Sequence, residues 1–318
     1  MRQDERMRGT HRAGVWALSA AACILAGGCG AAHAGKPLAL GPPARLPAAS
    51  SSHVVEIVME NTEYEEVIGN PAAPYINGLA RRYGLATAGY AITHPSLPNY
   101  LALTSGTTGG IESDCTSCTV KAPNIVDQLE AGRISWNAYL EDMPRPCFGG
   151  ASSAGYAKKH NPFQYYPDVA GSPSRCAHLV GFAALARNLR TGHLPAYSWI
   201  SPNLCDDGHD CALHTADGFL AGTVPALLRE LGPHGFLILT WDEGSTDRGC
   251  CTAAHGGHVA TIVAGPDVRA GARESLPLDH YGILATVERA FGLAPLAGAA
   301  GPSAGSLDPL FTHPPHLR

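Results

Sequence analysis

A single serine between two prolines opens the stretch of this chain with the most evident chemistry. Residues Thr93–Gly106 read T-H-P-S-L-P-N-Y-L-A-L-T-S-G, and the apolar spacing after Pro98 predicts a helix. Ser96 is therefore expected in a rigid turn at a helix N-terminus. Free N–H groups and the positive end of the helix dipole there favour a serine alkoxide or a bound phosphate. The alternative is an ordinary N-cap serine.

Polar and acidic side chains follow three predicted strands. After Val54–Met59, Tyr197–Ile200 and Phe236–Trp241 come, in turn, Glu60 and Asn61; Asp206, Asp207 and His209; and Asp242 and Glu243. Because the carboxyl ends of parallel strands share one edge, we expect these groups beside Ser96.

Carboxylates gathered without Lys or Arg repel one another, and oxygen ligands suit a hard or borderline divalent metal. A metal touching Ser96 would lower the pKa of its hydroxyl and stabilise a transferring phosphoryl group. The alternatives are a helix cap or solvated turn for each acidic pair and a structural role for each histidine. The recurrence at one edge favours the metal site.

Six short motifs together carry a resemblance to a known family. They are M-E-N at Met59–Asn61, H-P-S-L-P-N-Y at His94–Tyr100, K-H-N-P-F at Lys159–Phe163, S-P-N-L-C-D-D-G-H-D at Ser201–Asp210, T-W-D-E-G at Thr240–Gly244 and G-H-V-A-T-I-V-A-G-P at Gly257–Pro266. In this order they resemble the bacterial phosphoesterase family of acid phosphatases and phospholipases C. Within that family, the chain is most similar to the mycobacterial-type secreted acid phosphatases, which act on phosphatidylinositol 3-phosphate.

The resemblance implies an alkaline-phosphatase-like fold in which Ser96 becomes phosphorylated. It also implies a divalent metal held by the nucleophile with Glu60, Asn61, Asp242 and Glu243. The histidines at motif positions, which would bind phosphate or protonate the leaving group, are His94, His160, His209 and His258. The phospholipase C-type phosphodiesterases of the family carry Thr in place of Ser96 and are commonly longer at the C-terminus. Both differences favour a phosphatase acting on phosphomonoesters, including phosphoinositides.

Strands and helices alternate along the chain, which predicts a three-layer α/β fold with a mainly parallel central sheet. Besides the strands above, strands are expected at Thr87–Ile92, Ile134–Leu140 and Val259–Ala264, and helices at Pro74–Tyr83, Asn124–Ala131, Ala216–Leu231 and Tyr281–Phe291. The region Arg145–Cys176 is dense in Pro, Gly, Tyr and Cys. We expect it to be an insertion folded by disulfides over one face of a single domain, residues 54–318.

The N-terminus predicts export from a bacterial cell. Arginines precede a short apolar run, Val15–Leu25, so residues 1–34 read as a signal peptide. A lipobox ending at Cys29 would tether the protein to the membrane, whereas Ala32-His33-Ala34 would release it. Residues 35–53, rich in Pro, Ala and Ser, suit a linker.

Composition narrows the possible partners and the redox compartment. The net charge of −5 argues against a nucleic-acid-binding surface. Eight cysteines follow the leader, an even number that predicts disulfides in an exported protein, most simply between close pairs. Cys115 and Cys118 also match the C-x-x-C redox pattern, but without a thioredoxin-like context.

Two other readings belong to different classes of protein. Gly301–Gly305 matches the G-x-S-x-G pattern of α/β-hydrolases, but the pattern requires a strand before the serine and a helix after it. A lipid-anchored binding protein without catalysis would explain the leader, yet it gives no reason for carboxylates at successive strand ends.

Overall fold

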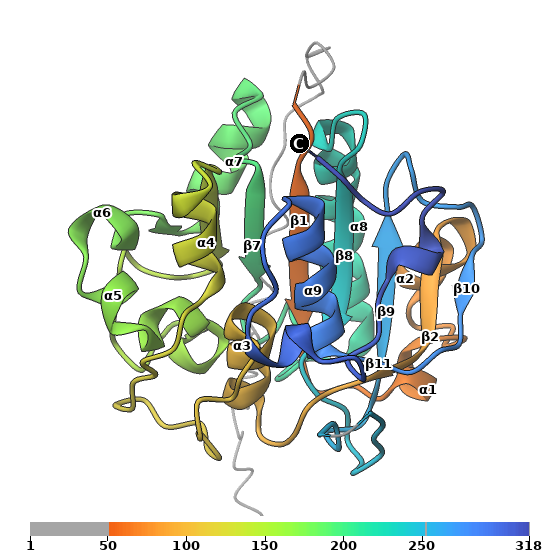
Figure 1. Cartoon of the computed structure of the whole chain (residues 1–318), viewed down its shortest axis with the longest axis horizontal. Helices are drawn as coiled ribbons and strands as arrows, with labels where there is room; N and C mark the ends of the chain where they lie inside the picture. The colour runs from red at the N-terminus through yellow and green to blue at the C-terminus, as the bar shows by residue number, and fades with distance from the viewer. Residues whose placement is uncertain (1–50, 252, 318) are drawn as a thin grey trace, which may run out of the picture. The chain divides into compact units, whose positions relative to one another are not determined.

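The computed structural model describes residues 51–251 and 253–317, which are built around a nine-stranded sheet (Figure 1). From one edge to the other the strands are β10 (Arg273–Glu274), β2 (Gly84–Tyr90), β9 (His258–Ala264), β8 (Phe236–Trp241), β1 (Val54–Met59), β7 (Tyr197–Ser201), β3 (Trp136–Leu140) and β6 (Leu179–Val180), and β11 (Leu278–Asp279) also pairs with β2. Among these strands only β9 runs antiparallel to its neighbours. The prediction of a mainly parallel sheet is therefore confirmed.

Helices cover both faces of the sheet and make three layers. On one face lie α3 (Ser96–Ser105), α4 (Ile125–Ala131) and α9 (His280–Ala290), and on the other α2 (Pro74–Arg82), α7 (Phe182–Thr191) and α8 (Leu213–Glu230). The central strand β1 is fully buried. Val54 and Val58 of β1 pack into the hydrophobic core under α3, α4 and α9, and Val55 and Ile57 pack into the core under α2, α7 and α8. The side chains divide in this way because alternate residues of a strand point to opposite faces of the sheet. This arrangement explains the uninterrupted apolar run of β1.

The predicted elements are all present, with differences at their ends. Strand β2 begins at Gly84 and ends at Tyr90, earlier than predicted at both ends, because its small residues carry a weak strand signal and the strand contains a register shift. Helix α7 and the antiparallel direction of β9 were not predicted. Helix α4 begins after Asn124, the first residue of the predicted range, whose side chain accepts from the Val126 N–H as a cap.

Short elements fill the predicted insertion. They are β4 (Ser152–Ser153), β5 (Tyr156–Ala157), η1 (Lys158–His160), η2 (Pro162–Tyr165), α5 (Pro167–Ala170) and α6 (Pro173–Cys176). A disulfide between Cys147 and Cys176 closes the segment. The other bridges in the described residues are local and join Cys115 to Cys118, Cys205 to Cys211 and Cys250 to Cys251. The expected pairing of close cysteines is therefore seen for these three bridges, whereas Cys147 and Cys176 are 29 residues apart.

The two ends of the chain concern the G-x-S-x-G pattern and the predicted signal peptide. The serine of Gly301–Gly305 lies between the 3-10 helices η3 (Ala297–Ala300) and η4 (Asp308–Leu310), which is not the strand and helix of a nucleophile elbow. The predicted signal peptide, both processing sites and most of the linker lie outside the described residues. The short helix α1 (Tyr64–Val67) completes the helices. None of the helices within the described residues is long and apolar enough to cross a membrane.

Candidate active site

The register between β1 and β8 brings the two acidic pairs together. Met59 is level with Trp241, and the Asp242 N–H donates to the Met59 carbonyl at 2.9 Å. The chain therefore leaves both strands at the same height. Asn61 then turns with a φ of 49°, a left-handed conformation that Asn tolerates, and its N–H donates to Asp242 Oδ1 at 3.1 Å.

Ser96 lies between these two strand ends. It is the first residue of α3, and Pro95 before it is the N-cap. The Ser96 side chain does not cap the helix. Its Oγ lies 3.1 Å from Glu60 Oε2 and 3.2 Å from Glu243 Oε1. The N-cap alternative is therefore wrong, and the hydroxyl is 1% exposed, in contact with carboxylates from two strands.

Asn99 explains why the turn before α3 keeps its shape. Its Oδ1 accepts from the backbone N–H groups of Ile92 and Thr93, both at 3.0 Å. Its Nδ2 donates to the carbonyls of Thr93 and Pro95 at 2.7 and 3.2 Å. One buried amide thus ties together the segment that presents Ser96. The sequence shows this Asn in the motif but gives no indication of its role.

The oxygens around Ser96 have the composition of a cation site. The side-chain oxygen of Asn61 lies 3.1 Å from Glu60 Oε2 and 3.1 Å from Glu243 Oε1. Three acceptor oxygens at this distance repel one another unless a cation lies between them, or unless the Asn61 amide is turned so that its nitrogen donates to the two carboxylates. Asp242 Oδ2 is buried without a hydrogen-bond partner. These groups fit a divalent metal because they are oxygen donors and because no positively charged partner balances them all.

The titration of these carboxyls reflects crowding. Burial, together with the charges of Glu60 and Glu243, raises the pKa of Asp242 well above its ordinary value. Burial also raises the pKa of Glu243, although a hydrogen bond from His94 opposes the shift. Without a cation, the neutral form of the buried Asp242 is therefore favoured.

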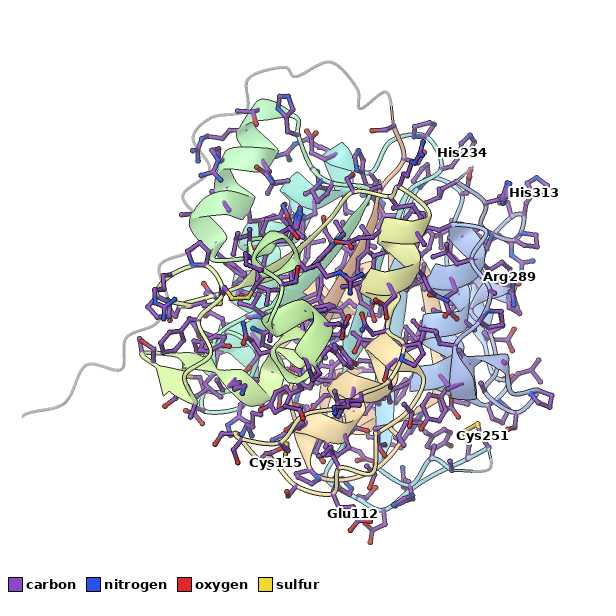
Figure 2. The ribbon with its side chains drawn as sticks, turned by 60° about the vertical axis from the view of Figure 1, so that its left-hand side comes forward. Glu112, Cys115, His234, Cys251, Arg289 and His313 are labelled. Carbon is purple, nitrogen blue, oxygen red and sulfur yellow. A yellow bond between two sulfur atoms is a disulfide. The ribbon has the colours of Figure 1, made fainter. Side chains whose placement is uncertain are left out.

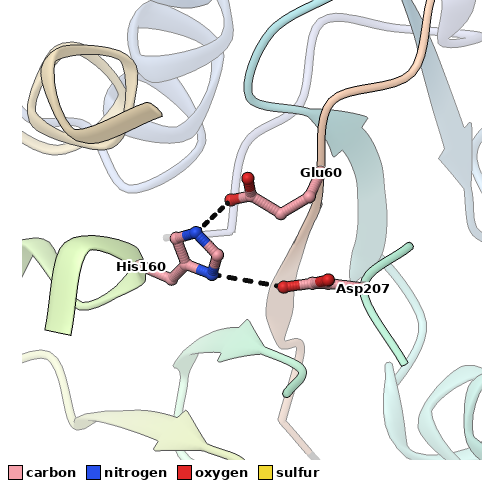
Figure 3. A group of neighbouring side chains, drawn as sticks. All are labelled: Glu60, His160 and Asp207. Carbon is pink, nitrogen blue, oxygen red and sulfur yellow. Dashed lines mark ion pairs between the residues drawn. The ribbon is translucent and has the colours of Figure 1, made fainter. Parts of the chain in front are cut away.

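The other oxygen of Glu60 faces a second group of side chains. Glu60 Oε1 accepts from the Tyr100 hydroxyl and lies 3.0 Å from His160 Nε2, and His160 Nδ1 lies 3.2 Å from Asp207 Oδ2 (Figure 3). The Tyr100 ring stacks on the His160 ring with centroids 5.3 Å apart. Donor atoms of Glu60, His160 and Asp207 all lie within 4.8 Å of one another, so these three residues could also hold a metal ion.

Charge explains how these three groups coexist. Burial disfavours the charged form of His160, but Glu60 and Asp207 outweigh burial and raise its pKa to about 9. Burial raises the pKa of Asp207 to about 6. An imidazolium can therefore pair with both carboxyl groups when no metal is bound. The sequence motifs did not single out Tyr100 as a site residue.

His209 belongs to an adjoining, more open group. Its Nε2 lies 3.1 Å from Lys159 Nζ, and its Nδ1 lies 2.7 Å from Asp210 Oδ1. Lys159 also forms an ion pair with Asp114 at 3.1 Å. His209 and His160 are close, with ring centroids 5.8 Å apart. Neither Lys159 nor Asp114 was among the predicted site residues.

The remaining two histidines lie at the edges of the site. His94 Nδ1 contacts Glu243 Oε2, while its Nε2 lies 3.2 Å from the Thr246 carbonyl, so His94 orients Glu243. His258 stacks on Tyr64, and its Nε2 lies 3.0 Å from the Thr87 carbonyl. Within the described residues, the recorded contacts of the His258 ring are with α1 and β2 and not with Ser96.

A comparison with protein families agrees with this arrangement. The sequence profile described as "Phosphoesterase family" matches residues 70–294, which is more than half of the chain. The chain belongs to the phosphoesterase family. The matched region includes Ser96, His160, Asp207 and Asp242. Membership of the family confirms the prediction that the chain is a phosphoesterase.

Curated relatives in this family are phosphatases. The phosphatidylinositol-3-phosphatase of Mycobacterium tuberculosis is 32% identical over 248 residues, which cover 76% of this chain and 77% of that protein. A probable acid phosphatase of Kluyveromyces lactis is 31% identical and matches 73% of this chain, but the chain spans only 56% of its length.

Solved structures support the fold independently of close sequence similarity. A member of the alkaline phosphatase superfamily from Vibrio parahaemolyticus superposes with a TM-score of 0.51 at 12% identity, covering 83% of this chain and 73% of that one. A sulfatase from a Pseudoalteromonas species superposes with a TM-score of 0.55 at 13% identity, covering 85% and 74%. These neighbours confirm the predicted alkaline-phosphatase-like fold.

Proposed function

We propose that this phosphoesterase is an exported, metal-dependent acid phosphatase that hydrolyses phosphomonoesters through a phosphoserine on Ser96. The observation that carries the proposal is the hydroxyl of Ser96, held at a helix N-terminus within 3.2 Å of two carboxylates from different strands. A nucleophile in this position attacks phosphorus, and the same oxygen is the leaving group when water attacks the phosphoserine. Two displacements retain the configuration at phosphorus.

We assign the metal to Ser96 with Glu60, Asn61, Asp242 and Glu243. A divalent ion held there would favour the alkoxide of Ser96 and offset the charge of the phosphoryl oxygens. Among the other groups, His94 orients Glu243, and His160 links Glu60 to Asp207. His258 begins β9 and stacks on Tyr64 of α1, so its proposed role is to support this edge of the sheet through packing.

His209 is the proposed general acid for the leaving alcohol. It is accessible, with 27% of its side chain exposed, whereas His160 is almost fully buried. Asp210 accepts from His209 Nδ1 and so stabilises the imidazolium that would deliver a proton from Nε2. When a phosphate engages Lys159, the Nε2 of His209 no longer accepts from that ammonium and is free to carry the proton.

The relatives direct the proposal for the substrate. One is named a phosphatidylinositol-3-phosphatase and several are named acid phosphatases. We therefore propose phosphatidylinositol 3-phosphate as a candidate substrate among phosphomonoesters. The local disulfides fit export to an oxidising compartment, and a lipidated Cys29 would place the enzyme beside a membrane. Turnover of a panel of phosphomonoesters, phosphoinositides and phosphatidylcholine across pH tests this choice against a phospholipase C.

The nucleophile is tested by Ser96→Ala. Turnover of p-nitrophenyl phosphate should fall by several orders of magnitude, as when a nucleophile is removed from a preorganised site, and chelator should inactivate the wild type. Acid-quenched wild-type enzyme should carry phosphate on the peptide containing Ser96. Ser105→Ala, at the other end of α3, is the matched control, because its buried hydroxyl donates to the backbone carbonyls of Leu101 and Thr107. Inversion at phosphorus would show that water attacks directly.

A further inference from the structure

The carboxylate of Asp114 bridges two groups that are suited to an anion. Its Oδ1 accepts from the backbone N–H of Leu97 at 3.0 Å, and Leu97 is the residue after Ser96. Its Oδ2 lies 3.1 Å from Lys159 Nζ. The Asp114 side chain is 28% exposed, whereas the Glu60 side chain is fully buried. Asp114 therefore stands on the solvent side of the proposed nucleophile.

The two partners of Asp114 are the donors that a phosphoryl group on Ser96 would need. The Leu97 N–H is in the first turn of α3, where free amides and the helix dipole favour negative charge. Lys159 adds a full positive charge, with its Nζ 3.1 Å from Asp114 Oδ2. Lys159 also lies beside His209, the proposed general acid. A phosphate and a carboxylate accept hydrogen bonds from the same kinds of donor.

Resting on the proposed function, we propose that Asp114 is an internal competitor for the substrate phosphate. Its carboxylate holds the Leu97 N–H and the Lys159 ammonium until a phosphate takes both. Two anions cannot share these donors without strong repulsion at hydrogen-bond distances. Asp114 therefore sets the affinity of the site for phosphate, both for the substrate and for the inorganic phosphate that is the product.

The loop that carries Asp114 is fixed by a disulfide and by a hydrogen bond from Lys158. The Cys115–Cys118 disulfide follows Asp114 directly, and Lys158 Nζ donates to the Thr116 carbonyl at 2.8 Å. Figure 2 shows Glu112 and Cys115 at the same end of the domain. Glu112 is exposed, two residues from Asp114, and has the same charge. It provides a matched control for the loss of one negative charge from this loop.

The test is the affinity for inorganic phosphate, measured by calorimetry at pH 7 and low ionic strength with the mature chain purified without chelator. Asp114→Asn keeps an oxygen for the Leu97 N–H but removes the charge, so phosphate should bind about tenfold more tightly than to the wild type. Glu112→Gln should change the affinity by no more than about twofold, because exposed charges are screened. An unchanged or weaker affinity in Asp114→Asn would overturn the proposal.

A second measurement uses only the wild type, so it does not depend on the folding of a variant. In a crystal structure with phosphate bound, phosphate oxygens should accept from Leu97 N and Lys159 Nζ, with the Asp114 carboxylate turned away from both. A phosphate bound elsewhere, with Asp114 still on Leu97, would contradict the proposal. Neither measurement requires turnover. A protein that binds phosphate in this way yet fails to hydrolyse p-nitrophenyl phosphate would contradict the proposed function and not this inference.

Discussion

Glu60 presents its two carboxylate oxygens to different partners. Oε2 faces the hydroxyl of Ser96, and Oε1 faces Tyr100 and His160. The buried imidazolium of His160 lowers the pKa of Glu60 despite burial, which alone would raise it. The charged form of Glu60 is thus favoured, whereas the neutral form is favoured for Asp242 beside it.

Replacement of Asp242 by Asn should remove metal binding without destabilising the fold. Because burial and the neighbouring carboxylates favour the neutral form of this carboxyl without a cation, the variant should melt at or above the wild-type temperature in chelator. Added Mg²⁺, Mn²⁺, Ca²⁺ or Zn²⁺, tried in turn, should stabilise the wild type with at least one ion, by about 2.7 kcal/mol at a hundredfold excess over Kd, but not the variant. Turnover should fall at least about a thousandfold.

The control is Asp267→Asn, because Asp267 has a partly exposed side chain paired with His234. Equal stabilisation of Asp242→Asn by the metal would contradict the assigned ligand set.

At the scale of elements, the insertion supplies two residues of the site. The 3-10 helix η1 carries Lys159 and His160, and it is joined to the sheet through the hydrogen bond from Ser201 Oγ to the His160 carbonyl at 2.7 Å. The Cys147–Cys176 bridge closes the loop of chain that contains η1. Such a bridge stabilises chiefly by limiting the unfolded chain, and it stabilises more for a longer loop.

Removal of this bridge should therefore affect stability more than removal of a short one. The cysteines are 29 residues apart, so a Cys147→Ser, Cys176→Ser variant should lose about 3 to 4 kcal/mol of unfolding free energy. The matched pair Cys115→Ser, Cys118→Ser, three residues apart, should lose about 1 to 2 kcal/mol. Urea denaturation measures both values. Equal losses in the two variants would contradict the loop-length argument.

At the scale of the whole domain, a further buried acid, away from the proposed metal ligands in sequence, lies within the central strand. Glu56 lies in the middle of β1, and the Tyr197 hydroxyl donates to its Oε2 at 2.9 Å while its Oε1 has no partner. Burial, only partly opposed by the hydrogen bond from Tyr197, raises the pKa of Glu56 from 4.5 to about 8. The folded chain therefore holds a proton here that the unfolded chain releases above pH 4.5.

Stability should depend on pH accordingly. The contribution of Glu56 is fully present below pH 4.5, and it is lost as the pH rises toward 8 at about 1.4 kcal/mol per unit. In Glu56→Gln this loss should be absent, so thermal melting between pH 5 and pH 8 should change less than in the wild type. Glu112→Gln should follow the wild type. Parallel melting curves for Glu56→Gln and the wild type would show that Glu56 is ionised in the fold. The expected profile suits a protein proposed to work in acid.

Local sequence determined the elements and the chemistry available at their ends. The apolar run of β1, the Asn124 cap and the P-S-L-P-N turn are decided by neighbouring residues, so they could be predicted. Because the ends of parallel strands share an edge, the closeness of Glu60 to Asp242 also followed. Tertiary structure alone decided the antiparallel direction of β9, the packing of His258 against α1 and β2, and the pairing of Asp114 with Leu97 and Lys159. These depend on pairing and loop closure between segments far apart in the chain, for which no local pattern of residues carries a signal.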